Sequence, residues 1–495
     1  MKIIGRIQEQ AELKRYYESG KPEFIAVTGR RRVGKTYLIR EMFSGEMAFY
    51  FSGSIGKNVT NNYQLRGFDE AIAEYSGGIK PVSKCWSDAF YELQKMLETP
   101  PGRQMEQRSR SQRRLQPRQP RQSQRPRQVI FIDELPWLDT PKSDFLPALD
   151  RFWNSFVSSR PDLMLVVCGS AASWIVKNIF ENKGGLHNRI TGRIALAPFT
   201  LGECEAFFNE YGIVMNRYQI AEIYMVFGGI PYYLNLLEKN LGPTQNIDRL
   251  LFADNAPLKN EFNEVYRSLF RASDRHIGIV SALSKTMAGL TRDEIIKIAK
   301  IPGGGNLTKT ISELEQCGFI EKYFDFTKHK NSAYYRLVDP FSLYWLKYVD
   351  NNNTKDEYYW TNLLSDGRRH AWSGYAFEQL CLLHITQIKR KLGISGISTE
   401  VFAWRSNNTS PGAQIDLLIV RKDGVINLCE MKYSQHPYTI SMKYDQELLH
   451  KKMAFLGETG SRHAIHITMV TAYGLSDKGY KASIQSEVTL DDLFL

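Results

Sequence analysis

Apolar runs and amphipathic stretches alternate along the first part of the chain. Residues 23–28, 129–132 and 163–168 form apolar runs that are typical of strands buried on both faces. A helical stretch at 145–157 separates the last two runs, and a further helix is expected from about Thr36. Strands that alternate with helices predict a parallel sheet that helices cover on both faces.

Between residues 271 and 349 the pattern changes to three helices followed by two strands. The helical patterns span 277–283, 291–299 and 307–316, and the strand patterns span 318–324 and 332–338. This is the order of a winged helix-turn-helix, with a wing tip at 327–330. The third helix carries Lys309 but also Glu313 and Glu315, so it offers few cations to DNA phosphates. DNA binding and a purely structural coupling role both stay open.

A strand, a tight turn and a second strand are predicted at 414–420, 421–424 and 425–432. On such a hairpin Glu430 and Lys432 share one face, and Asp416 can come to lie beside Glu430. Two carboxylates on one face repel each other, and a divalent metal between them is the simplest relief. Lys432 beside that metal could deprotonate or orient an attacking water, or stabilise charge on a phosphodiester.

The net charge of the chain is concentrated in one segment. The 495 residues carry a formal charge of +11, yet residues 101–128 alone hold nine arginines and a single glutamate. This Arg/Gln-rich segment has too few apolar residues to form a core, so we interpret it as a disordered insert. The overall basicity is therefore weak evidence for a nucleic-acid partner.

Several classes of protein are disfavoured by composition. The six cysteines are scattered without a CxxC pair, which disfavours a zinc knuckle or a disulfide framework. No apolar run approaches the roughly 20 residues of a membrane span. We therefore expect a cytoplasmic protein with no membrane partner, and the length suggests about three domains.

Residues 29–36 read G-R-R-R-V-G-K-T and stand between a predicted strand and a predicted helix. This is the phosphate-binding loop pattern, in which backbone N–H groups surround phosphate oxygens, the lysine reaches the β and γ phosphates and the threonine ligates Mg²⁺. ATP and Mg²⁺ are the expected cofactors. The residues expected to contact nucleotide here are Gly29, Arg30, Arg31, Arg32, Val33, Gly34, Lys35, Thr36 and Tyr37.

Two carboxylates, Asp133 and Glu134, end the apolar run at 129–132. With the phosphate loop upstream, Asp133 is expected to hold Mg²⁺ and Glu134 to polarise the water that attacks the γ phosphate. Arg189 and Arg193 are candidate arginine fingers, because phosphoryl transfer is accelerated by a cation placed on developing charge. Either could act in its own chain or in a neighbour, so self-association stays open.

The motifs of roughly the first 350 residues resemble those of archaeal-type AAA-superfamily ATPases, which are also widespread in bacteria. The matching segments are I-G-R at 4–6, the phosphate loop, F-I-D-E-L-P-W at 131–137, C-G-S at 168–170 and F-G-G-I-P-Y at 227–232. The resemblance implies that Ile4, Gly5 and Arg6 flank the adenine. It also implies that Ser170 senses the γ phosphate and that the turn at Gly228, Gly229 and Pro231 belongs to a helical lid.

The hairpin motif Asp-x13-Glu-x-Lys, preceded by a helix with a carboxylate at Glu378, resembles the PD-(D/E)XK nuclease superfamily. The resemblance implies that Glu378, Asp416 and Glu430 ligate Mg²⁺ or Mn²⁺, that Lys432 completes a catalytic site and that DNA or RNA is the partner. The proline of the motif is absent, since Gln414 and Ile415 precede Asp416. Residues 366–495 hold fifteen Lys+Arg and thirteen Asp+Glu, so their overall charge attracts DNA only weakly.

The fold class expected from all of this is α/β: a P-loop parallel-sheet ATPase core with a helical lid, a winged helix-turn-helix and a C-terminal α/β restriction-endonuclease-like domain. The expected boundaries are 1–200 for the core with its 101–128 insert, 201–270 for the lid, 271–349 for the winged helix, 350–366 for a linker and 367–495 for the nuclease-like domain. The leading hypothesis is an ATPase that controls a metal-dependent nuclease. The alternative is a signalling switch whose nuclease fold is a non-catalytic binding module.

Overall fold

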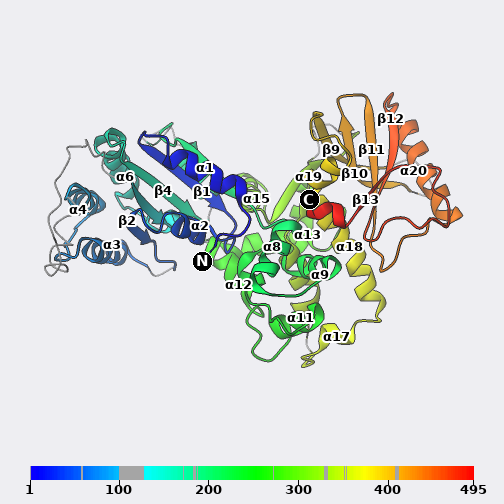
Figure 1. Cartoon of the computed structure of the whole chain (residues 1–495), viewed down its shortest axis with the longest axis horizontal. Helices are drawn as coiled ribbons and strands as arrows, with labels where there is room; N and C mark the ends of the chain where they lie inside the picture. The colour runs from blue at the N-terminus through cyan, green and yellow to red at the C-terminus, as the bar shows by residue number, and fades with distance from the viewer. Residues whose placement is uncertain are drawn as a thin grey trace, which may run out of the picture. The chain divides into compact units, whose positions relative to one another are not determined.

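A computed structural model places the chain in two compact units, Met1–Ala197 and Pro198–Leu495 (Figure 1). It describes residues 2–495 with these gaps: 57–58, 100–126, 171, 182–185, 187, 271, 328–332, 351, 353 and 407–411. The predicted disordered insert therefore lies almost wholly outside the described residues, as does most of the predicted wing tip.

The first unit is built on a five-stranded sheet of order β2-β3-β4-β1-β5 in which every neighbouring pair is parallel. Its strands are β1 (Glu23–Gly29), β2 (Met47–Ser52), β3 (Gln128–Asp133), β4 (Leu163–Gly169) and β5 (Gly192–Leu196). The expected parallel sheet is confirmed. Strands β2 and β5 were not predicted. The sequence of β5 is short and alternates between buried and exposed positions, which leaves a weak pattern. Strand β2 was missed although residues 47–51 form a continuous apolar run.

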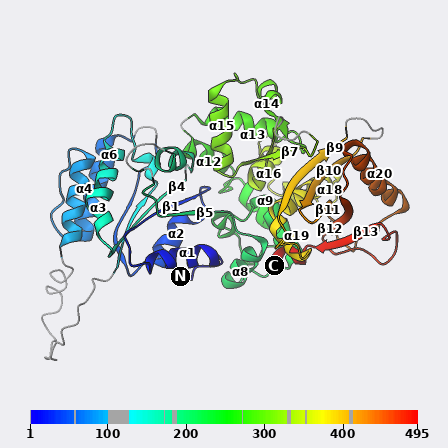
Figure 2. The ribbon, with the colours of Figure 1, turned by 90° about the horizontal axis from the view of Figure 1, so that it is seen from above.

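Helices cover this sheet on two sides (Figure 2). They are α1 (Ile7–Tyr17), α2 (Lys35–Met42), α3 (Asn61–Ser76), α4 (Trp86–Glu98), α6 (Phe145–Ser155) and α7 (Ala172–Ile175), with short turns η1 (Leu135–Trp137), η2 (Val157–Ser159) and η3 (Val176–Phe180). Aromatic residues of α3, α4 and α6 form one buried cluster with strand residues that include Phe24 and Phe49. This packing fixes the sheet edge from which the phosphate loop leaves β1.

The second unit begins with helices α8 (Leu201–Tyr211), α9 (Arg217–Phe227), α10 (Pro231–Leu234), α11 (Pro243–Leu251) and α12 (Glu261–Leu269). Capping boxes start two of them, at Thr200 with Glu203 and at Asn216 with Gln219. The turn after α9 requires glycine, since a Cβ added at Gly229 would lie 1.9 Å from the carbonyl oxygen of Phe199.

Three helices and a small antiparallel sheet follow. They are α13 (Ser273–Leu283), β6 (Leu290–Thr291), α14 (Arg292–Ala299), α15 (Gly305–Gln316), β7 (Ile320–Phe324) and β8 (Ala333–Leu337), with strand order β6-β8-β7. The two-residue strand β6 was not predicted, because so short a pairing leaves no periodic pattern.

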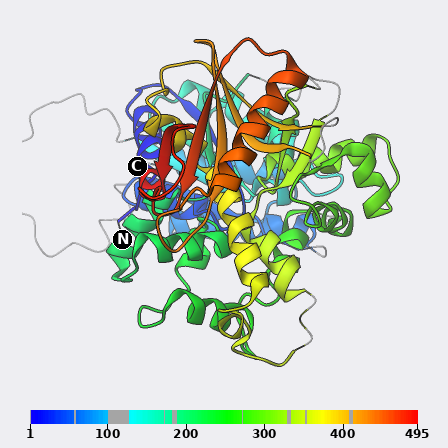
Figure 3. The same cartoon turned by 90° about the vertical axis from the view of Figure 1, so that its right-hand side faces the viewer.

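The rest of the unit contains a second five-stranded sheet, of order β13-β12-β11-β10-β9 (Figure 3). Strands β9, β10 and β11 pair antiparallel, whereas β11, β12 and β13 pair parallel. The elements are α16 (Pro340–Tyr344), η4 (Trp345–Val349), α17 (Tyr359–Asn362), α18 (Gly367–Leu383), α19 (Ile385–Lys391), β9 (Thr399–Arg405), β10 (Gln414–Arg421), β11 (Val425–Lys432), α20 (Met442–Thr459), β12 (Ala464–Thr471), β13 (Ile484–Thr489) and η5 (Asp491–Phe494). Phe455 of α20 packs on Trp404 and Leu428 of this sheet.

A buried histidine joins the first helix of this unit to the end of α18. Nε2 of His384 accepts a hydrogen bond of 3.1 Å from the backbone N–H of Leu201, and Nδ1 lies 2.8 Å from the carbonyl oxygen of Leu380. Both bonds are satisfied by a neutral ring protonated at Nδ1. Burial lowers the pKa of His384 to about 4, because the charged ring would lose its hydration.

We expect His384 to make the second unit sensitive to mild acid. In the unfolded chain the imidazole takes up a proton below about pH 6.5, whereas in the folded protein it does so only near pH 4. The free energy of unfolding should therefore fall as the pH drops below about 6.5, by about 2 kcal/mol at pH 5. Urea denaturation at pH 7 and pH 5 measures this loss.

The matched comparison uses His384→Gln and, at an exposed position, His436→Gln. The His384→Gln protein should lose about 2 kcal/mol less than wild type between pH 7 and pH 5, while His436→Gln should follow wild type. An unchanged pH dependence in His384→Gln would rule out this histidine as the cause.

Among the described residues, no helix combines the length and the apolar character needed to cross a lipid bilayer.

Candidate functional site

The phosphate loop of the first unit runs from the end of β1 into α2. Gly29 and Gly34 adopt positive φ angles of 146° and 92°, and Arg32 has a φ of 71°. A Cβ added at Gly29 would lie 2.4 Å from the carbonyl oxygen of Leu196, so the loop begins where only glycine fits. Lys35 and Thr36 open α2, as the sequence pattern predicts.

Lys35 is buried and its ammonium group is held by three oxygens. Nζ donates to the carbonyl oxygens of Gly29 at 2.9 Å and Arg30 at 3.1 Å, and to Oγ of Ser170 at 3.2 Å. The side chain thus lies folded back along the loop. A phosphate would have to replace these neutral acceptors, which a charged oxygen does readily because ionic hydrogen bonds are stronger.

Asp133 and Glu134 meet the loop from the end of β3. Thr36 Oγ1 and the thiol of Cys168 both donate to the Asp133 carboxylate. Burial and the nearby Asp133 raise the pKa of the Cys168 thiol well above its usual value, which keeps it a donor. Cys168 was missed as a partner of Asp133, since a lone cysteine in an apolar strand carries no such signal.

Glu134 is tied to Ser170 at the end of β4. Its carboxylate accepts hydrogen bonds from Oγ of Ser170 at 2.6 Å and from the Ser170 backbone N–H at 3.3 Å. Glu134 itself has a φ of 48°, a left-handed conformation that is uncommon for this residue type. Lys35, Thr36, Asp133, Glu134 and Ser170 therefore form one connected network.

The other residues expected to contact nucleotide lie in the segment 4–6 and along the phosphate loop. Arg6 donates to the carbonyl oxygen of Val33 at 3.2 Å, and Gln10 holds the carbonyl oxygen of Gly5 at 2.7 Å, so the segment 4–6 is anchored beside the loop. Arg30 and Val33 are buried, whereas Tyr37 is 38% exposed. The contacts of Arg31, Arg32 and Tyr37 with nucleotide stay predictions.

The two candidate arginine fingers are exposed in this structure. Arg193 pairs in register with Ala26, three positions before Gly29 along the neighbouring strand, and its guanidinium lies 4.0 Å from the centre of the Phe180 ring. Three strand positions correspond to about 10 Å, so the backbone of Arg193 is set back from the loop. Arg189 lies in the turn before β5.

Pro231 begins α10 in the second unit, and its role in a helical lid stays a prediction.

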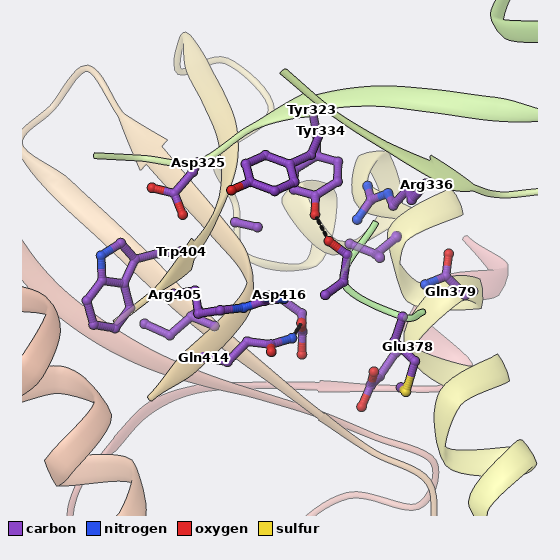
Figure 4. A pocket seen from close by; sticks show the side chains of 15 residues that line it. Tyr323, Asp325, Tyr334, Arg336, Glu378, Gln379, Trp404, Arg405, Gln414 and Asp416 are labelled. Atoms are coloured by element: carbon purple, nitrogen blue, oxygen red, sulfur yellow. Dashed lines mark hydrogen bonds between the residues drawn. The ribbon is translucent and has the colours of Figure 1, made fainter. Parts of the chain in front are cut away.

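The four C-terminal candidates gather in the second unit. Leu417 pairs with Cys429 across β10 and β11, and continuing this register by one position sets Asp416 opposite Glu430. Glu378 reaches the same place from α18 (Figure 4). Burial, together with the nearby Asp416 and Glu430, raises the pKa of Glu378 to about 8, despite Lys432 and Lys451, which act in the opposite direction. The metal-ligand roles of Glu378, Asp416 and Glu430 and the catalytic role of Lys432 stay predictions.

Three further side chains complete this cluster. Lys451 of α20 forms an ion pair with Glu430 at 2.7 Å, and Tyr444 OH donates to the other carboxylate oxygen at 3.1 Å. The Lys432 ammonium lies 4.9 Å from the centre of the Tyr444 ring, and Gln414 donates to Asp416. Lys451 and Tyr444 were missed, because no local motif marks them. They lie seven residues apart and so share one helical face.

The cluster is not arranged as a compact metal cage. Within the described parts of the chain, no group of three or more His, Cys, Asp or Glu side chains is placed to hold a metal ion. Burial raises the pKa of Glu430 as well, with Lys451 opposing this effect. An all-oxygen donor set whose members repel one another still matches what Mg²⁺ or Mn²⁺ prefers, because a dication would relieve that repulsion.

Comparison with known proteins identifies one domain. Residues 4–237 match the family model of an ATPase domain found predominantly in Archaea, so this part of the chain is an archaeal-type P-loop ATPase domain. A curated relative is the uncharacterized protein MJECL04 of Methanocaldococcus jannaschii, 22% identical over 353 residues, which cover 71% of this chain and 69% of that protein.

Among solved structures, the Walker-type ATPase PABY2304 of Pyrococcus abyssi is similar with a TM-score of 0.48 and 17% identity, covering 70% of this chain and 96% of that chain. The ORC2 protein of Aeropyrum pernix is similar with a TM-score of 0.41 and 13% identity, covering 70% and 94%. Each of these two structures is similar to 70% of this chain and leaves the rest unmatched.

Proposed function

We propose that this chain hydrolyses ATP with Mg²⁺ at its first site and cleaves nucleic acid with a divalent metal at its second site. In this proposal residues 271–349 form a winged helix-turn-helix and residues 367–495 a nuclease-like domain. The observation that carries the second half is the meeting of Glu378, Asp416, Glu430 and Lys432 at the end of one hairpin. The archaeal-type ATPase domain carries the first half.

At the ATPase site the chain would bind the phosphates of ATP, activate the attacking water and sense the γ phosphate. Lys35 would leave its carbonyl partners and bind phosphate oxygens, and Glu134 would accept a proton from the attacking water. Because Ser170 contacts both Lys35 and Glu134, binding at Lys35 would also release or reorient the Glu134 carboxylate. Mg²⁺, held by Thr36 and Asp133, would neutralise charge on the phosphates.

At the second site Lys432 is the residue best placed to assist hydrolysis. It lies on β11 two positions after Glu430 and therefore on the same strand face. Its ammonium could hold the attacking water or stabilise the charged phosphodiester. A dication held by Glu378, Asp416 and Glu430 would polarise the phosphodiester and acidify a bound water.

The winged segment is joined to the edge of the second sheet. Beyond β7, Asp325 bridges to Ala403 of β9, and the backbone N–H of Phe326 donates to the Ala403 carbonyl oxygen at 3.0 Å. On the third helix, Glu313 pairs with His276 at 2.8 Å. These contacts favour a coupling role for the segment over insertion of its third helix into a DNA groove.

The ATPase domain and the nuclease-like segment share contacts within the second unit. The family match extends to residue 237 and so includes α8 and α9. Tyr218 of α9 stacks on Tyr433 at 5.0 Å and on Tyr473 at 5.4 Å, measured between ring centres. Tyr433 directly follows Lys432, so a movement of α9 would shift Tyr433 and with it the position of Lys432 at the second site. We take this stack as the route by which nucleotide state controls cleavage.

The alternative is a switch whose nuclease-like domain only binds partners. The ion pair between Lys451 and Glu430 favours it, because Lys451 neutralises a carboxylate that a metal would otherwise use. The two functions differ in whether the carboxylates bind a dication.

Metal titration by calorimetry, without nucleotide, separates the two functions. Wild-type protein should bind Mg²⁺ or Mn²⁺ at a site that Asp416→Ala removes and that the surface control Asp423→Ala retains. Because Glu378 has a pKa of about 8, it is largely protonated at pH 7, and metal binding should release a proton. Buffers of different ionisation enthalpy reveal that release. Identical isotherms for wild type and Asp416→Ala would favour the binding module.

A further inference from the structure

A cavity of about 110 Å³ opens beside the carboxylates of the second site (Figure 4). Glu378 and Asp416 form one side of it, and Trp404 and Arg405 of β9 form another. The remaining wall comes from β7 and β8 of the small antiparallel sheet, through residues such as Tyr323. The winged segment thus encloses a space that the nuclease-like domain alone would leave open.

Arg405 is an unusual cation in this cavity. It is exposed, and although its backbone belongs to the β9–β10 ladder, its side chain has neither a hydrogen bond nor an ion pair among the described residues. Arg336, on the facing wall, is instead paired with Glu321 and lies over the ring of Tyr323. A guanidinium that keeps its donors free next to two carboxylates can accept an anionic group bidentately, and a phosphate matches its geometry.

The cavity also offers a buried acceptor and flat rings. Gln379 is 5% exposed, and its side-chain oxygen has no hydrogen-bond partner within the described structure. Tyr323 and Tyr334 stack with their ring centres 5.6 Å apart and their planes inclined by 27°, and Tyr323 OH donates to the carbonyl oxygen of Ala288. An unpaired buried acceptor is costly in a protein, and a ligand N–H or O–H would satisfy it.

We propose that this cavity binds one unpaired nucleotide of a single-stranded nucleic acid, with a phosphate on Arg405 and the nucleoside against Gln379 and the tyrosine pair. Aromatic faces combined with a cation are how proteins hold unpaired bases. A base pair within a duplex is too wide for so small a cavity, whereas an unpaired base can reach its walls from the open side. The inference rests on the proposed function and adds the class of its substrate.

Binding of a fluorescein-labelled single-stranded DNA oligonucleotide, followed by anisotropy in EDTA, tests this inference independently of cleavage. Wild type should bind the single strand more tightly than the matching duplex. Arg405→Ala should weaken single-strand binding about tenfold, as expected for loss of a charge-assisted hydrogen bond. It should also reduce the slope of log affinity against log salt by about 0.7, the value for one phosphate contact.

Two further variants make the test specific. Arg462→Ala removes an equal charge from an exposed position in the same segment and should leave affinity and slope unchanged. Gln379→Met removes the amide at similar size and should weaken binding severalfold without altering the salt slope. Equal binding of duplex and single strand, or Arg405→Ala behaving like Arg462→Ala, overturns the inference. Metal-dependent cleavage that needs Lys432 would still uphold the proposed function in that case.

Discussion

Replacing Glu134 with glutamine is expected to lower steady ATP turnover by about 10²–10⁴-fold, the usual contribution of a general base. The amide keeps the size of the side chain and can still accept the hydrogen bond from Ser170 Oγ, seen at 2.6 Å in the native protein. It cannot accept a proton from the attacking water. Nucleotide affinity should therefore stay close to that of wild type, because Lys35 and Thr36 are untouched.

Phosphate release and fluorescent-nucleotide binding, measured on the same preparations, check both parts of this expectation. Lys35→Ala should lose turnover and affinity together, since it removes the cation that binds the phosphates. Glu92→Gln, at a partly exposed residue that forms an ion pair with Lys95, is the matched control and should hydrolyse ATP normally. Steady ATP hydrolysis by Glu134→Gln would show that Glu134 is not the general base. Steady hydrolysis by Lys35→Ala would show that Lys35 is not needed to bind the phosphates.

Replacing Lys432 with alanine is expected to lower metal-dependent cleavage by about 10²–10³-fold while ATP hydrolysis continues at the wild-type rate. Removing one preorganised group that stabilises a transition state typically has an effect of this size. The substitution leaves the carboxylates in place, so the metal titration should still show binding. Lys443→Ala, at an exposed position on α20, provides the control for loss of one positive charge.

Gel analysis of labelled single-stranded and duplex substrates measures this effect. Asp416→Asn should give the same loss of cleavage but should also lose the bound metal, which distinguishes a metal ligand from a residue that acts on water or phosphate. If Lys432→Ala cuts as fast as wild type, the cleavage must come from other residues.

Patterns confined to a few neighbouring residues predicted much of this molecule. The apolar runs identified β1, β3 and β4, because a strand buried on both faces has no polar positions. The phosphate loop and the hairpin at residues 414–432 were predictable for the same reason, since each is a local motif with fixed spacing. The meeting of Glu378 with the hairpin carboxylates required an analogy to a known superfamily.

Features that depend on distant residues escaped prediction. Lys451 neutralises Glu430 from a helix that begins ten residues after β11 ends, and no spacing rule connects the two. The cavity at Arg405 joins β7 and β8 to β9, and the four α-helices α16 to α19 and more than sixty residues separate β8 from β9. Cys168 and the Tyr218, Tyr433 and Tyr473 stack depend in the same way on tertiary packing. Such contacts follow from the three-dimensional arrangement of the sheets, which local patterns in the sequence do not reveal.

We propose above all that one chain couples an ATPase to a metal-dependent nuclease. A panel of single-stranded and duplex DNA and RNA, incubated with purified wild-type protein in Mg²⁺ or Mn²⁺, with and without ATP, tests it most directly. We expect metal-dependent cleavage of single strands that changes with ATP, disappears in Lys432→Ala and loses its ATP dependence in Lys35→Ala. If every substrate stays intact with both metals and in both nucleotide states, while the same protein hydrolyses ATP, the claim is contradicted.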